Sequence, residues 1–241
     1  MSRSRDALKL AVMGLSLCAA HGAWSQTAHY PQGRPQLSDP SQLPNWSGMW
    51  ERAGDNVWDN SLPPGRPQLP PYNEQYQKRA AEEPDAPRGS SISAYHSMPA
   101  WMNHLFPMDL QISPMQVTLM TGNKDQARRI YTDGREPTDG TLPSTTGYSV
   151  GKWVNGELLV ETCCVREDTR LSGGGPHSDA MRIKERFYLR DHKTLVVEMT
   201  VEDPKAFTQP WKVEKVWYRR PAWESVEYLR DENDRDAGGR K

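Results

Sequence analysis

A mainly β fold is predicted for this chain of 241 residues, with antiparallel strands that close into a barrel or half-barrel. After residue 114, segments rich in Val, Thr and aromatic residues alternate with turn signals such as Asn155-Gly156. These segments follow one another with short connections, and closing such a meander removes its exposed edges. Nine Trp and nine Tyr against three Phe supply large rings for the core, and a formal net charge of −1 argues against a disordered chain.

The first 25 residues have the pattern of a secretory signal peptide. Basic residues up to Lys9 precede the apolar run 10–20, and Ala23 and Ser25 offer a cleavage site after Ser25. The apolar run is too short to span a bilayer. We therefore expect a periplasmic or secreted protein with no membrane insertion.

Residues 26–114 are expected to form an irregular arm, because 14 of the 20 prolines lie there and proline interrupts regular elements. Within this arm we expect a first strand near residues 46–52 and a helix over residues 73–83, capped by Asn73. A helical turn is expected around residues 100–105.

The barrel is assigned to residues 115–230, followed by a polar tail at residues 231–241. Inward and outward side chains alternate most clearly between residues 181 and 190, where Glu185 shares a face with Phe187. The expected strands are residues 116–121, 127–132, 148–154, 157–165, 181–190, 194–202 and 210–219.

The motif Gly48-Met49-Trp50 resembles the start of lipocalin-type barrels, in which the Trp plugs the closed end and an Arg near the end of the last strand packs over it. Arg219 or Arg220 is placed to be that Arg. A lipocalin-like barrel and other β-barrel or sandwich forms both fit the strand pattern.

Four motifs follow one another in the chain: W-S-G-x-W at residues 46–50, R-R-I-Y-T-D-G-R at 128–135, G-x-S-x-G-x-W at 147–153, and P-H-S with a later E-R at 176–186. In this arrangement the chain, from about residue 43 to residue 233, resembles an abundant family of exported bacterial proteins. The function of that family is largely uncharacterised, so the resemblance implies an exported single domain rather than a reaction. The chain departs from the family pattern at residues 153–157 and at Cys163-Cys164, where Val-Gly is more usual.

His177, Glu185 and Asp133 are the candidate catalytic residues. His177 follows a Gly-rich loop at a strand entrance and is suited to proton transfer near neutral pH. Glu185, facing inward, and Asp133 could orient it. The structural alternatives are a loop histidine, a buried ion pair of Glu185 with an arginine such as Arg129, and a simple turn residue at position 133.

Substrate binding is assigned to side chains expected around the mouth of the barrel. Arg135 would hold a polar end of the substrate, and aromatic rings would stack on its apolar part. A lid from the arm would cover the open end, with packing of the arm as the alternative. The residues assigned in this way are Arg135, Tyr131, Tyr148, Trp153, His96 and Trp101.

Ser149 lies in a Gly-x-Ser-x-Gly pattern, but a nucleophile elbow needs a following helix and a hairpin follows here, so we expect Ser149 on a strand. Neither metal nor cofactor is expected, because the histidines are scattered singly and no GxGxxG or P-loop occurs. The balanced charge argues against a nucleic-acid partner. Cys163 and Cys164 are open to three interpretations: ordinary strand residues, a strained vicinal disulfide, or a metal or redox pair.

Two functions fit these features. One is a cofactor-independent enzyme that performs acid/base chemistry, as a lyase, isomerase or ether/ester hydrolase, on a small apolar or aromatic molecule in the barrel. The other is a non-catalytic carrier of a small hydrophobic ligand. The polar set of His177, Glu185, Asp133 and Arg135 favours the enzyme.

Overall fold

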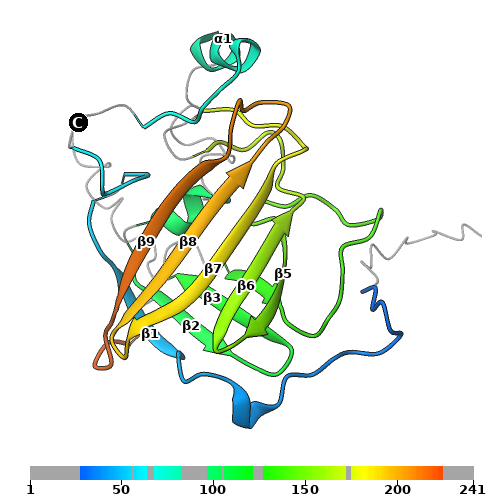
Figure 1. Cartoon of the computed structure of the whole chain (residues 1–241), viewed down its shortest axis with the longest axis vertical. Helices are drawn as coiled ribbons and strands as arrows, with labels where there is room; N and C mark the ends of the chain where they lie inside the picture. Colours follow the sequence, from blue (N-terminus) through cyan, green and yellow to red (C-terminus); the bar gives the residue numbers. More distant parts are fainter. Residues whose placement is uncertain are drawn as a thin grey trace, which may run out of the picture.

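Nine strands, hydrogen-bonded in sequence order, close into a barrel in the computed structural model (Figure 1). The structure describes residues 28–55, 57–63, 68–82, 97–104, 106–121, 127–171 and 175–224. The expected signal peptide, His96 and the expected polar tail lie outside these residues. The predicted β-barrel is thus confirmed.

The strands, in chain order, are β1 (Gly48–Arg52), β2 (Met108–Ile112), β3 (Gln116–Thr121), β4 (Ala127–Tyr131), β5 (Tyr148–Val154), β6 (Glu157–Cys163), β7 (Arg182–Asp191), β8 (Thr194–Glu202) and β9 (Trp211–Arg219). Strand β1 pairs with β9 and closes the barrel, with Trp50 opposite Arg219. The Asn155-Gly156 turn joins β5 to β6, and both of its residues have the positive φ values that such a turn requires.

One pair departs from the expected antiparallel meander. Strands β4 and β5 run parallel, with Ile130 opposite Ser149 and Tyr131 opposite Val150. The long connection 132–147 carries the chain back to the starting end of the barrel, as a parallel pair requires. A closed barrel with an odd number of strands cannot be antiparallel at every pair, so the ninth strand and the parallel pair belong together.

Strand β2 was not predicted, because it lies in the proline-rich region that was expected to be irregular. Its residues nevertheless alternate, with Met108 and Leu110 buried in the core. Pro107 and Pro114 flank the strand rather than interrupt it. The barrel therefore draws two strands, β1 and β2, from the region assigned to the arm.

Trp50 closes one end of the barrel, as the Gly-x-Trp motif predicts. Its ring is fully buried, and its indole nitrogen donates a hydrogen bond to the carbonyl of Trp46 at 2.8 Å. The guanidinium of Arg219 lies 4.9 Å from the ring centroid, whereas Arg220 pairs with Glu51. The blue segment before β1 crosses this lower end in Figure 1.

The other end carries two short helical elements. Helix α1 (Glu74–Glu82) begins where the Asn73 side chain accepts a hydrogen bond from the Tyr76 amide at 3.0 Å, which confirms the expected cap. The 3-10 turn η2 (Ala100–Asn103) confirms the second expected helical segment, and it buries Trp101 in the core. Figure 1 shows α1 above the upper end of the barrel.

Replacing Trp50 by Ala is expected to lower the free energy of unfolding by about 3–5 kcal/mol, because it leaves a cavity at the closed end and removes the partner of Arg219. Urea unfolding followed by circular dichroism measures this loss. The control is Tyr218→Ala, on the neighbouring strand β9 and 43% exposed, which should cost less than about 0.5 kcal/mol. Equal losses in the two variants would contradict the stabilising role of the buried Trp50 ring.

Candidate functional site

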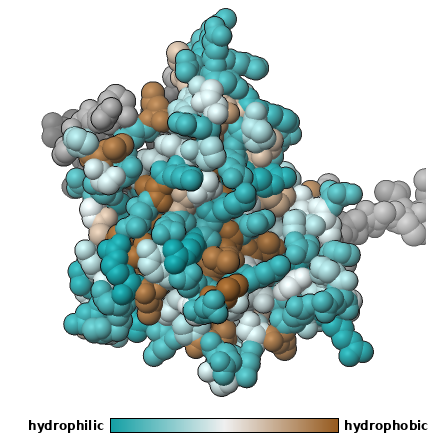
Figure 2. All heavy atoms as spheres, in the orientation of Figure 1, coloured by the Kyte–Doolittle hydropathy of each residue, from teal (hydrophilic) through white to brown (hydrophobic). Residues whose placement is uncertain are grey.

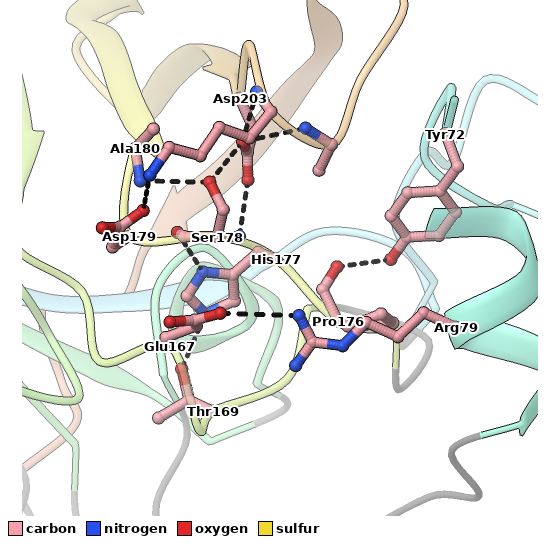
Figure 3. Close-up of polar contacts among 12 residues, drawn as sticks. Tyr72, Arg79, Glu167, Thr169, Pro176, His177, Ser178, Asp179, Ala180 and Asp203 are labelled. Atoms are coloured by element: carbon pink, nitrogen blue, oxygen red, sulfur yellow. Dashed lines mark hydrogen bonds and ion pairs between the residues drawn. The ribbon is translucent and has the colours of Figure 1, made fainter. Parts of the chain in front are cut away.

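His177 lies in the connection between β6 and β7, fully buried and outside the sheet (Figure 3). Its Nδ1 donates to the carbonyl of Ser178 at 2.9 Å, and its Nε2 lies 3.0 Å from the hydroxyl of Thr169. Burial lowers the pKa of His177, so the neutral ring is favoured. Both nitrogens are thus engaged within the loop.

Ser178 and Asp203 explain why this loop is well defined. The Asp203 carboxylate accepts hydrogen bonds from the amide of Ser178 at 2.7 Å and from its hydroxyl at 2.6 Å. It also accepts from the amides of Lys205 and Ala206, at 3.2 Å each. The Pro-His-Ser motif therefore joins the β6–β7 loop to the β8–β9 turn, as Figure 3 shows.

Glu185 points into the barrel, as the alternation predicts. Its side chain has no exposed surface and forms an ion pair with Arg128, whose Nη1 lies 2.9 Å from Oε1. Arg128 also donates to the hydroxyls of Ser149 and Thr162, at 3.3 and 3.1 Å. The predicted partner of Glu185 was Arg129, and this prediction is wrong by one position. The pleat of β4 turns Arg128 inward and leaves Arg129 exposed.

His177 and Glu185 have no described contact in common. Glu185 is enclosed with Arg128 and two hydroxyl groups, whereas His177 is enclosed by its own loop. Ser149 lies on β5 as expected, with its hydroxyl 2.8 Å from that of Thr162. These contacts do not assemble the expected acid/base pair.

Four of the predicted residues do come together where the connection after β4 begins: Asp133, Arg135, Tyr131 and Tyr148. Three nitrogen-to-oxygen contacts of 2.6–3.1 Å join the Arg135 side chain to the Asp133 carboxylate. The guanidinium also lies 4.0 Å from the ring centroid of Tyr131, which lies 5.3 Å from that of Tyr148. Burial alone would raise the pKa of Asp133, but its hydrogen bonds to Arg135 outweigh this and lower it.

Arg135 also lines a groove of about 490 Å³ on the outer face of β5–β8. Its apolar part comes from Val150, Val154 and Leu159, and the last two are 43% and 41% exposed. Figure 2 shows hydrophobic surface on this side of the molecule, bordered by hydrophilic side chains. The charged residues of the groove are of both signs: Arg135, Glu136, Lys152, Glu161, Lys184, Glu185, Arg186 and Glu198. The Glu185 side chain has no exposed surface.

The remaining expected binding residues lie elsewhere. Trp153 is half-buried and packs edge-on against Trp46, with 5.1 Å between ring centroids. Trp101 is buried against His104, with 4.9 Å between centroids. Neither lines the groove.

Lys215 is a buried cation that the sequence analysis missed. Its ammonium donates to Asn103 Oδ1 at 2.7 Å and to the carbonyls of Val57, at 3.1 Å, and Trp58. The alternation of Trp211, Val213, Lys215 and Trp217 would have placed it inward by the argument that placed Glu185. Burial lowers the pKa of Lys215 to about 7, and the charge of Arg52 acts in the same direction.

No protein-family model and no curated protein matches the chain. Within the described ranges, no group of three or more His, Cys, Asp and Glu residues is placed to hold a metal ion. The helices described are also too short or too polar to cross a membrane.

Replacing Glu185 by Ala is expected to cost about 3–5 kcal/mol of unfolding free energy, because the Arg128 charge would stay buried without its partner. The double variant Arg128→Met/Glu185→Leu should recover most of this loss, because no buried charge remains. Urea unfolding of the single and double variants measures both effects. A loss below about 1 kcal/mol for Glu185→Ala would show that water or another group compensates Arg128.

Lys215 should make the stability depend on pH. Between pH 7 and the ordinary lysine pKa near 10.4, the unfolded chain keeps a proton that the folded chain has released, so the free energy of unfolding rises with pH. We expect a rise of about 1–2 kcal/mol between pH 7 and 8.5, which is lost in Lys215→Met. Denaturant titrations at these pH values test this. A slope that survives in Lys215→Met would assign it to another group.

Proposed function

We propose that the protein is a non-catalytic binding protein for a small apolar or aromatic molecule that carries a polar end. The supporting observation is the outer groove, whose volume of about 490 Å³ lies in the range of small-molecule sites. An apolar floor with charged groups around it is also the usual composition of such sites. The ligand would lie on Val154 and Leu159, with its polar end toward Arg135.

The surroundings of the floor support a binding role over a purely structural one. Ion pairs rim the groove: Arg186 contacts Glu157 at 2.7 Å and Glu198 at 3.2 Å, and Lys184 contacts Glu202 at 2.9 Å. Such pairs hold long side chains in place at the edge, which reduces the entropy that a ligand would have to remove. Exposed apolar side chains enclosed by polar ones are typical of binding sites.

The geometry gives less support to the enzyme. Acid/base catalysis needs its groups within hydrogen-bond reach of one substrate, and the environments of His177 and Glu185 are separate. Among the described residues that line the groove, none is His, Cys or Ser. We further propose, from the basic and apolar start of the chain, that the protein acts in the periplasm or outside the cell.

Replacing Leu159 by Glu is expected to weaken binding of 8-anilinonaphthalene-1-sulfonate roughly tenfold, about 1.4 kcal/mol, because a carboxylate would replace the apolar floor. The dye has an aromatic body and an anionic end, as the proposed ligand class requires. Fluorescence titration measures its Kd. The fold should survive, because residue 159 faces outward between Lys152 and Arg186.

Met115→Glu is the matched control, since Met115 is also 41% exposed but lies in the β2–β3 turn away from the groove. It should bind the dye like the unmodified protein. Equal binding by both variants and the unmodified protein would remove the groove as the site. A product found by mass spectrometry after incubation with a bound small molecule would instead establish an enzyme.

A further inference from the structure

Two neighbouring thiols, Cys163 and Cys164, lie at the end of β6 and do not line the groove. A regular strand would turn them to opposite faces. Cys164, however, has φ +59°, a left-handed conformation that is uncommon for a residue with a side chain. The alternation ends there, and the Cys164 thiol lies close enough to Cys163 to affect its pKa. Cys163 is buried and Cys164 half-buried, so the pair can be reached from the side of Cys164.

The backbone beneath these thiols is held on both sides. Cys163 pairs with Tyr148 in the β5–β6 ladder, and the Ser144 amide donates to the Cys164 carbonyl at 3.0 Å. Gly147 has φ +69°, and a Cβ on it would lie 2.6 Å from the Cys163 carbonyl oxygen. Residue 147 therefore has to be a glycine for the chain to pass so close to the Cys163 carbonyl, where β6 ends.

We propose that Cys163 and Cys164 form a dithiol site for trivalent arsenic, as arsenite or a monosubstituted organic arsenical. With an arsenical that carries one As=O group, two As–S bonds replace the bond to oxygen, and the two thiol protons leave with that oxygen as one water molecule. With arsenite, two of the three As–OH groups leave as two water molecules. The oxidation state of arsenic is unchanged, so the step needs no oxidant or reductant.

The geometry favours this ligand over a disulfide. The Cα atoms of adjacent residues are about 3.8 Å apart across a trans peptide, which is shorter than the roughly 4.4–6.8 Å usual between disulfide-bonded cysteines. A disulfide would therefore be strained, whereas an inserted arsenic atom widens the ring. The pKa of Cys163 is raised to about 12, mainly by burial and secondly by the neighbouring Cys164 thiol. Such a pKa disfavours the thiolate that disulfide exchange requires. The arsenical supplies an oxygen that takes up the proton as the sulfur binds.

The same geometry disfavours the common thiolate-bound metals. Zinc takes four ligands in structural sites, and in the described ranges no third His, Cys, Asp or Glu joins the pair. Copper(I) with two thiolates prefers them on opposite sides of the metal, an arrangement that the short link between adjacent residues disfavours. Pyramidal trivalent arsenic takes two sulfurs close to a right angle, which suits such a pair.

Phenylarsine oxide added to the full chain, after reduction with a phosphine, tests the site by intact mass spectrometry. We expect one phenylarsenic group per chain with loss of one water molecule, resistant to glutathione but removed by 2,3-dimercaptopropanol. Chelation by two thiols should make the affinity at least about 100-fold higher than that of Cys163→Ser or Cys164→Ser. The control, made in the uncleaved chain, is Cys18→Ser, which removes the third cysteine of the sequence, in the expected signal peptide, and should bind like the unmodified protein.

Unchanged binding in either Cys163→Ser or Cys164→Ser would overturn the proposal, because one thiol would then suffice. So would a disulfide between the two cysteines that dithiothreitol does not open. Arsenite in place of phenylarsine oxide distinguishes the inorganic from the organic ligand, and binding of either one supports the site. Near-ultraviolet circular dichroism should be unchanged in the serine variants, and dye binding in the groove should be independent of them.

Discussion

The ion pair between Arg128 and Glu185 joins β4 to β7 inside the barrel, where neither side chain has any exposed surface. Two charges removed from water are tolerated only when their partners are well placed. Here Arg128 also donates to the Ser149 and Thr162 hydroxyls, and its Nε is left without a hydrogen-bond partner among the described residues. Each of these four residues comes from a different strand. The position of β4, β5, β6 and β7 relative to one another is thereby tied to a single enclosed polar cluster, and the apolar core packs around it.

The odd number of strands sets the position of the groove. Because nine strands close the barrel, one neighbouring pair has to be parallel, and β4–β5 is that pair. The connection 132–147 then has to cross outside the sheet, since the interior is filled. Asp133 and Arg135 hold its first turn against Tyr131, and Arg135 reaches the outer face beside β5. The groove is thus a consequence of the crossover together with the apolar outward residues of β5 and β6.

Alternation along the strands predicted much of this fold and part of the site. It placed Glu185 inward. The closeness of Asp133 and Arg135 to the strand that ends at Tyr131 also suggested the cluster that these residues form with Tyr148. The parallel pair and strand β2 were missed, because register and strand direction depend on contacts far apart in the chain. The loop around His177 shows the same limit. The hydrogen-bond partners of His177, Thr169 and Ser178, are close in the chain, but Asp203, which binds Ser178 and so fixes the loop, lies beyond β8.

The Pro-His-Ser motif shows why a residue type suited to catalysis is weak evidence for it. A histidine acts as a general base through a ring nitrogen that substrate can reach, whereas His177 is fully buried with one nitrogen donating to a carbonyl and the other against a hydroxyl. Its lowered pKa follows from burial and needs no catalytic purpose. The same holds for Glu185, whose oxygens are occupied by Arg128. Arg135, by contrast, lies beside the apolar floor of the groove on the outer surface, where a ligand could contact it.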